Sequence, residues 1–154
     1  MGKVGVVIPV YNRIASTMRA IDSIREQTAA VDEVIVVDDG STIDLSSVRS
    51  HLKCAGGRWI RLAENAGVAA ARNAGVAESD SSWICFLDSD DEWLPQKIER
   101  QMEWHRENVS IRISQVQEEW IRNDKPVKKP PHWRQEGGGF SQTPWSAAPF
   151  PLRV

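Results

Sequence analysis

Short apolar runs alternate with amphipathic segments through roughly the first two thirds of the chain. The runs are rich in β-branched residues and end at Gly, Pro or acidic positions, which is typical of buried strands. They predict strands at residues 4–8, 33–37, 58–62 and 83–87. Because Pro9 cannot donate a hydrogen bond to a sheet ladder, we expect it at the end of the first strand.

The segments between these runs have the apolar spacing of helices. Residues 14–27, 44–53 and 65–75, together with a segment that begins near Pro95, are predicted to be helical. Few bulky side chains occur in 65–75, so this helix should lie close to the sheet or to a ligand. The inward stripe of the last helix is predicted to comprise Leu94, Ile98, Met102 and His105. His105 is therefore interpreted as a packing residue rather than a ligand.

Strands that alternate with helices at this spacing predict βαβ units, a mainly parallel sheet and an α/β fold. The pattern changes after Asn108. Polar and apolar residues alternate over 110–120, which predicts a strand, and Asn123–Asp124 has the composition of a hairpin turn. We expect one domain over residues 1–136 and an irregular or disordered tail over 137–154.

Acidic residues follow two of the predicted strands directly. Asp38 and Asp39 end the second strand, and Asp88 and Asp90 end the fourth. Ligands of open α/β sheets bind beyond the carboxyl ends of the strands, and carboxylate oxygens suit Mg²⁺ or Mn²⁺. Asp88, Ser89 and Asp90 therefore indicate a clamp for a metal and a diphosphate. The alternative is a solvated acidic turn that precedes the next helix.

Composition excludes several classes of protein. The chain is 41% hydrophobic and 26% charged, as in soluble globular proteins, and its net charge of -2 gives no sign of a nucleic-acid surface. Residues 4–10 are too few for a membrane span, so we expect no transmembrane segment, and the two cysteines favour a reduced, cytoplasmic setting. A glycine-rich phosphate turn after the first strand and a P-loop are both missing, which excludes dinucleotide oxidoreductases and P-loop NTPases.

Four segments together carry a family resemblance: residues 6–13, 36–42, 65–75 and 86–93. In their order and spacing, the chain resembles the nucleotide-sugar-binding half of family 2 glycosyltransferases. The resemblance is strong over residues 3–108 and weaker to Glu136. It implies the GT-A fold, a Rossmann-like, mainly parallel sheet flanked by helices, here with an incomplete C-terminal acceptor region.

The resemblance also implies roles for individual residues. Asp39 matches the acid that hydrogen-bonds the base, and Asp88 and Asp90 match the DxD motif, which meets the ribose and the metal; Asp91 is a further possible ligand. The other positions that match the nucleotide-sugar site are Pro9, Tyr11 and Asn12 beside the base and Arg72 near the diphosphate.

Three of these roles have a plainer alternative. Asp39 is alternatively a turn acid that bonds the backbone, a role that Asp38 can take instead. Tyr11 is alternatively a core aromatic, and Arg72 a solvated residue on a helix face. At an open crevice Asp39 should support little of the core, so we expect its removal to leave the fold intact.

The implied activity is inverting transfer of a sugar from a nucleoside-diphospho-sugar, with a UDP-sugar the expected donor, to a hydroxyl of a sugar or lipid-linked acceptor. The implied cofactor is Mn²⁺ or Mg²⁺. The catalytic base is not identified, and no later acid matches it convincingly, among them Glu118, Glu119, Asp124 and Glu136. The last residues do not fit the expected fold, so the chain is expected to be truncated or frame-shifted near Gly137. The alternative function is a catalytically inactive remnant that binds a nucleotide-sugar.

Overall fold

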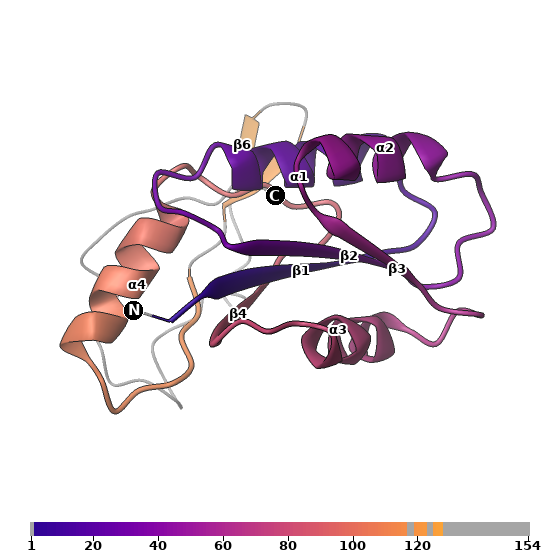
Figure 1. Ribbon diagram of the computed structural model, residues 1–154. Coiled ribbons are helices and arrows are strands. Elements are labelled where there is room, and N and C mark those ends of the chain that lie inside the picture. Colours follow the sequence, from indigo (N-terminus) through magenta and orange to yellow (C-terminus); the bar gives the residue numbers. More distant parts are fainter. Residues whose placement is uncertain (1, 117–118, 123–124, 128–154) are drawn as a thin grey trace.

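A computed structural model of the chain describes residues 2–116, 119–122 and 125–127 (Figure 1). The strands and helices alternate as the hydrophobic pattern predicts. In chain order they are β1 (Val4–Val10), α1 (Ala15–Arg25), β2 (Glu33–Asp38), α2 (Ser46–Cys54), β3 (Arg58–Arg61), α3 (Val68–Ala77), β4 (Trp83–Phe86), α4 (Lys97–Glu107), β5 (Trp120–Arg122) and β6 (Lys125–Val127).

The first four strands form one parallel sheet in the order β3-β2-β1-β4. Helices α1 and α2 cover one face of this sheet and α3 covers the other (Figure 1). From β1 to β3 each new strand is added on the same side, and β4 is then added on the other side of β1. Because crossovers between parallel strands are right-handed, this change of side places α3 on the face of the sheet opposite to α1 and α2. The predicted α/β fold is confirmed. The change of side also leaves a topological switch point beside β1, where open sheets bind ligands.

Alternate residues of β1 enter two different cores. Val6 and Ile8 pack with buried residues of α1, α2 and α4, whereas Val7 packs with Ile35, Val37 and Ala71 on the α3 side. Burial on both faces explains why the central strands read as unbroken apolar runs rather than as alternating ones.

Helix α3 lies directly against the sheet, as its small residues predict. Ala71 is completely buried, and a Cβ added to Gly75 would lie 2.4 Å from Cγ1 of Val7. Side chains larger than these would push α3 away from β1 and β2. The small residues of α3 therefore allow this helix to lie close to the sheet.

Two proline positions differ from the sequence prediction. Pro9 lies one residue inside β1 rather than at its end. Pro9 is paired with Val37 of β2, but the ladder between β1 and β4 ends at Val7. Pro9 therefore lies beyond the part of β1 that pairs with β4, where a missing N–H can be tolerated. Pro95 lies in the turn before α4, one position ahead of the N-cap residue Gln96, and not in the first helical turn.

The strand predicted over 110–120 is wrong for most of its length, because residues 111–116 have no regular structure. Side chains of α4 hold this segment instead of a ladder: Gln101 Nε2 donates to Ser114 Oγ at 2.6 Å, and His105 Nδ1 lies 3.1 Å from the carbonyl oxygen of Ile111. The predicted hairpin is confirmed, since β5 and β6 pair antiparallel, although residues 123–124 themselves lie outside the described residues.

The predicted helices are present with slightly shorter or shifted bounds. The predicted tail, 137–154, lies outside the described residues. Over the part of the chain that the structure describes, no helix has both the length and the apolar character needed to cross a membrane.

Candidate functional site

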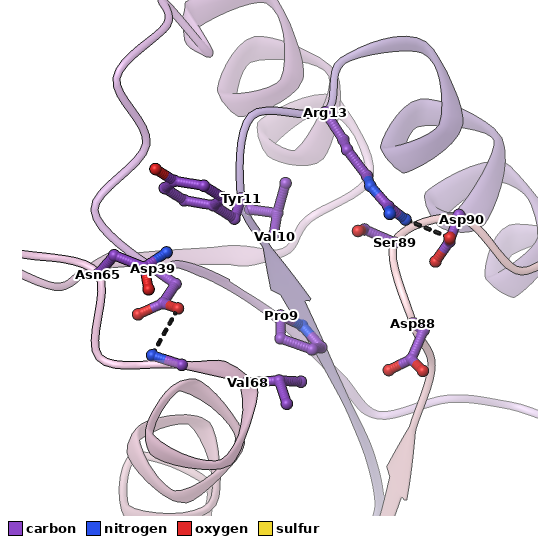
Figure 2. Close-up of a pocket in the computed structure, with 11 residues that line it drawn as sticks. Pro9, Val10, Tyr11, Arg13, Asp39, Asn65, Val68, Asp88, Ser89 and Asp90 are labelled. Atoms are coloured by element: carbon purple, nitrogen blue, oxygen red, sulfur yellow. Dashed lines mark hydrogen bonds and ion pairs between the residues drawn. The ribbon is translucent and has the colours of Figure 1, made fainter.

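A cleft of about 370 Å³ lies at the carboxyl ends of β1, β2 and β4 (Figure 2). Its described lining combines three acids, one cation and several small or apolar residues: Pro9, Val10, Tyr11, Arg13, Asp39, Asn65, Gly67, Val68, Asp88, Ser89 and Asp90. Six of the nine residues that the sequence suggested for the site line this cleft, Ser89 among them, whereas Asn12 and Arg72 lie beside it and Asp91 is not part of its described lining.

Figure 2 shows the cleft as two walls separated by Pro9. Tyr11, Asp39 and Asn65 form one wall, and Asp88 and Asp90 lie on the other. Tyr11 is 42% exposed, which excludes its interpretation as a core aromatic. One wall thus offers an aromatic face beside a carboxylate, and the other a pair of acids.

The two acids at the end of β2 have different environments. Asp38 is completely buried; its Oδ1 accepts the amide N–H of Ser41 at 2.8 Å and its Oδ2 lies 2.7 Å from Nη1 of Arg61. Asp38 is therefore the turn acid. Asp39 projects into the cleft, yet its two oxygens accept the amide N–H groups of Ala66 and Gly67 at 2.8 and 2.9 Å.

These bonds make Asp39 the anchor of the loop before α3. With only 4% of the residue exposed, its carboxylate is not the dispensable group expected from an open crevice. Carboxylate oxygens have more than one lone pair each, so both remain able to accept a further hydrogen bond from a ligand. The role of Asp39 in base recognition remains a prediction.

Asn12 braces the loop after β1 rather than lining the cleft. It has a φ of 54°, a left-handed conformation that asparagine tolerates better than most residues. Its Oδ1 accepts the amide N–H of Thr42 at 2.8 Å, and its own N–H donates to Ser41 Oγ at 2.9 Å. The loops after β1 and β2 are joined by these bonds, which fixes the position of Tyr11.

Arg72 is paired rather than solvated. Its Nη2 donates to Asp88 Oδ1 at 2.5 Å, and its guanidinium lies 5.5 Å from the ring centroid of Phe86. The side chain is 34% exposed, and its Nε is buried and has no hydrogen-bond partner among the residues that the structure describes. Helix α3 thus places a cation behind the first acid of the DxD sequence.

Asp90 is paired with a residue that is not among the site residues predicted from the sequence. Arg13, in the loop after β1, forms an ion pair with the Asp90 carboxylate (Figure 2). The sequence contained a signal for this pair, because Arg13 follows β1 at the same edge of the sheet as four acids. Since Asp88 binds Arg72 and Asp90 binds Arg13, each acid of the DxD sequence has its own arginine.

The chemistry of these donors fits a hard divalent cation in part. Within the described ranges, no cluster of three or more acidic, His or Cys side chains is arranged to hold a metal. Mg²⁺ is usually bound by one or two carboxylates together with substrate phosphates, so two acids suffice when a diphosphate supplies the other ligands. Asp88 and Asp90 would have to give up their arginine partners, in part or fully, to act in this way.

His105 is a packing residue, as predicted. Its ring centroid lies 4.4 Å from that of Trp83, and its Nε2 lies 2.8 Å from Ser114 Oγ. Among the later acids considered for the catalytic base, Glu119 is half-buried, whereas Glu118, Asp124 and Glu136 lie outside the described residues.

Comparison with known proteins gives a consistent result. The family model described as "Glycosyl transferase family 2" matches residues 5–147. An "Uncharacterized glycosyltransferase" of Rickettsia bellii is 43% identical over 109 residues, and the putative teichuronic acid biosynthesis glycosyltransferase TuaG of Bacillus subtilis is 33% identical over 106. These alignments cover 71% and 68% of this chain but only 16% and 42% of the relatives, so the chain spans less than half of either protein.

Solved structures show the same fold. Staphylococcus aureus TarS 1-349 in complex with UDP-GlcNAc has a TM-score of 0.70 at 21% identity, over 82% of this chain and 37% of that one. The mannosyltransferase PcManGT of Pyrobaculum calidifontis, in complex with GDP-Man and Mn²⁺, has a TM-score of 0.62 at 26% identity, over 68% of this chain and 32% of that one.

Proposed function

The chain belongs to glycosyl transferase family 2, and on that basis we propose that its cleft binds a nucleoside-diphospho-sugar together with a divalent cation, for inverting transfer of the sugar to an acceptor hydroxyl. The observation that carries the proposal is the cleft itself. One wall has a carboxylate and an aromatic ring, the other has the two DxD acids, and both lie at the carboxyl edge of a parallel sheet. We assign the donor-binding unit to residues 1–136.

The base of the donor is assigned to the Tyr11 wall. Asp39 has free lone pairs that accept an N–H from a base edge, and Tyr11 and Pro9 offer it apolar contact. A uracil ring has such an N–H, and a UDP complex of a structural neighbour is known. We therefore propose a UDP-sugar as donor, with the GDP-sugar bound by another neighbour as the first competitor to test.

The diphosphate is assigned to the wall with Asp88, Ser89 and Asp90. Among the described residues, three carboxylates line the cleft, and Arg13 and Arg72 offset only two of these charges, so a diphosphate would meet a net negative charge there without a further cation. A divalent ion, when bound, supplies charge stabilisation of the leaving diphosphate. Mn²⁺ in a neighbour of the same fold makes it the first ion to try. Arg72 would then hold the orientation of Asp88 from behind.

A nucleotide-sugar-binding protein without transfer activity is the second candidate. Each acid in the described lining of the cleft is already bonded: Asp39 to two amides, Asp88 to Arg72 and Asp90 to Arg13. No carboxylate among these residues is left over as a general base. Removal of such a base typically costs roughly 10²- to 10⁴-fold in rate, and loss of acceptor positioning can cost as much.

The decisive experiment is a calorimetric titration of the chain with UDP in Mn²⁺ and again in excess chelator. We expect binding at least about tenfold tighter in Mn²⁺, because the cation offsets the acids that face the diphosphate. Equal affinity in the two buffers would remove the metal from the proposal, and no binding in either would contradict the proposed function. Release of UDP from a bound UDP-sugar, measured over a panel of sugar and lipid acceptors, then separates a transferase from a binding protein.

A further inference from the structure

We propose that Arg13 is an exchangeable counter-ion: it pairs with Asp90 in the empty cleft and moves to the donor diphosphate when a divalent cation takes its place. This inference rests on the proposed function, because it assigns a new role in the same cleft. It predicts that Arg13 acts in opposite directions on two ligands. It should weaken binding of the cation alone and strengthen binding of the nucleotide with the cation.

The position of Arg13 supports this exchange. Among the described residues that line the cleft, Arg13 is the one cation, and its guanidinium points toward Asp90, with which it forms an ion pair (Figure 2). The two side chains are 47% and 52% exposed. A pair so open to water is only weakly held, since exposed ion pairs contribute factors of about 1.5 to 5 in an equilibrium constant.

The second arginine of the site is held differently. Arg72 projects from α3 behind Asp88, contacts the Phe86 ring and has a buried Nε, and it does not line the cleft. Its guanidinium is therefore fixed by packing as well as by charge. The two DxD acids thus differ in their partners. Asp88 is paired with an arginine that packing holds in place, whereas Asp90 is paired with an arginine that can move away.

The backbone of Arg13 is anchored while its side chain is not. Its carbonyl oxygen accepts the hydroxyl of the buried Thr17 at 2.9 Å, which fixes the start of α1. No other hydrogen bond or ion pair of the Arg13 side chain, apart from the one with Asp90, is present among the described residues. Rotation about the side chain can therefore carry the guanidinium to a diphosphate in the same cleft without any change in the fold.

The chemistry of arginine suits both partners. Its planar fork of N–H donors matches a carboxylate and a phosphate equally well. While the cleft is empty, Arg13 offsets part of the repulsion between Asp90 and Asp88. Once a cation occupies Asp90, an arginine in the same place would be repelled by it, whereas the diphosphate oxygens would attract it.

The test compares wild type with Arg13→Gln, which keeps a polar side chain but shortens it and removes the charge. Binding of Mn²⁺ alone is measured by electron paramagnetic resonance of the free ion, and binding of UDP in saturating Mn²⁺ by calorimetry. We expect the Mn²⁺ affinity to rise about two- to fivefold, since the competitor for Asp90 is gone. We expect the UDP affinity to fall about tenfold, the scale of a lost charge-assisted hydrogen bond.

Arg19→Gln is the matched control, because Arg19 forms a similarly exposed pair with Glu92 outside the cleft. It should change neither affinity. Arg13→Lys keeps the charge and should restore the low Mn²⁺ affinity but only part of the UDP affinity, since lysine lacks the fork. Raised salt should shrink the difference in Mn²⁺ affinity, as screening weakens the exposed pair.

An unchanged or lower Mn²⁺ affinity in Arg13→Gln, or no measurable Mn²⁺ binding to either protein, would overturn the inference whatever UDP does. An unchanged UDP affinity would overturn the second half of the exchange. Failure of the proposed function looks different: wild type then binds no UDP in any buffer, while a rise in Mn²⁺ affinity in the variant would still support competition for Asp90.

Discussion

Arg61 at the end of β3 lies 2.7 Å from the carboxylate of Asp38, which is completely buried at the end of β2. The second nitrogen of the guanidinium, Nη2, donates to the carbonyl oxygen of Ser41 at 2.8 Å, and the amide of Ser41 donates to Asp38. These three groups close the turn that presents Asp39 to the cleft. The shape of the cleft wall thus depends on a buried charge with a half-exposed partner.

Arg61→Gln should therefore destabilise the protein. It leaves the Asp38 carboxylate buried with the Ser41 amide and without its cation, at a cost of about 1–3 kcal/mol in the free energy of unfolding. The 3–5 kcal/mol typical of a fully buried pair is an upper limit, because Arg61 is 55% exposed. Urea denaturation gives the value. Arg19→Gln, which breaks the exposed pair with Glu92, should cost less than about 1 kcal/mol; equal costs would show that Asp38 does not need Arg61.

Asp39→Ala should lower stability even without any ligand. The substitution leaves the amides of Ala66 and Gly67 without an acceptor, and hydrogen bonds to charged groups contribute about 1.5–3 kcal/mol each. Because water can reach this loop once the side chain is gone, we expect a total loss of about 1–3 kcal/mol. Thermal denaturation of the ligand-free protein measures it.

Asp80→Ala is the control for this substitution, since Asp80 is an exposed acid outside the cleft, and it should be close to neutral. Equal melting temperatures for Asp39→Ala and wild type would show that Asp39 does not stabilise the loop and that its role is limited to ligand binding. The distinction matters for binding experiments, because weaker UDP binding by Asp39→Ala would otherwise be read as loss of a base contact when the loop itself has moved.

Glu33 at the start of β2 should make stability depend on pH. Burial would raise the pKa of this carboxyl, but hydrogen bonds from Ser79 and Ser81 and the charge of Arg58 outweigh it and hold the pKa below its ordinary value of 4.5. A depressed folded pKa contributes stability that is complete above the unfolded value. That stability is lost as pH falls below about 4.5 and through the lower folded pKa.

Glu33→Gln tests this dependence. The variant should be less stable than wild type at pH 7, and the difference should diminish as the pH is lowered below 4.5. Urea denaturation at a series of pH values supplies the comparison, with Glu64→Gln, at an exposed acid, as the control. A difference that stays constant with pH would mean that Glu33 acts through packing rather than through its charge.

Gly75→Ala should destabilise the contact between α3 and the sheet. The new methyl group would lie 2.4 Å from Cγ1 of Val7 and 3.2 Å from Cγ2 of Val37, both completely buried. Overpacking of this kind costs about 1–3 kcal/mol, against a gain of about 1 kcal/mol in helix propensity. We expect a net loss of up to about 2 kcal/mol in chemical denaturation. Asn73→Ala, at an exposed position of α3, should be neutral or slightly stabilising; a similar gain for Gly75→Ala would refute the tight contact.

The local pattern of hydrophobic and acidic residues was sufficient to predict the sheet and the edge of the sheet where ligands bind. The β-branched runs at Val4–Val10 and Glu33–Asp38 form strands because both of their faces are buried, and such runs are visible in the sequence. The acids that follow the strands are placed by strand direction alone, so Asp39, Asp88 and Asp90 were found without any structure.

The partners of those acids were not predictable in the same way. Asp38 and Asp39 are neighbours of the same type, and only the positions of Arg61 and of the Ala66–Gly67 amides decide which one is buried in the turn. Likewise, the alternation over 110–120 favoured a strand, but hydrogen bonds from α4 side chains to residues 111–114 prevailed over it. Contacts between distant segments carry the information that a local pattern lacks.

The two DxD acids should differ in their effect on metal-dependent binding. Asp88 is held by Arg72 at 2.5 Å and Asp90 by the more exposed Arg13, so Asp90 is the acid more readily released to a cation. Asp90→Asn keeps the shape and removes one charge. It should abolish most of the gain in UDP affinity that Mn²⁺ provides, whereas Asp88→Asn should retain a larger part of that gain.

The measurement is a calorimetric titration of UDP at several Mn²⁺ concentrations, in which the dependence on Mn²⁺ and not the affinity alone is compared. Asp80→Asn provides a change of the same charge outside the cleft and should leave the dependence intact. Asp88→Asn also removes one negative charge from the cleft and leaves the charge of Arg72 behind it unbalanced, so its UDP affinity in chelator should rise relative to wild type. The reverse ranking, with Asp88→Asn insensitive to Mn²⁺ and Asp90→Asn still responsive, would make Asp88 the principal ligand. It would also mean that a guanidinium fixed by packing, and not the exposed one, is the partner that a cation displaces.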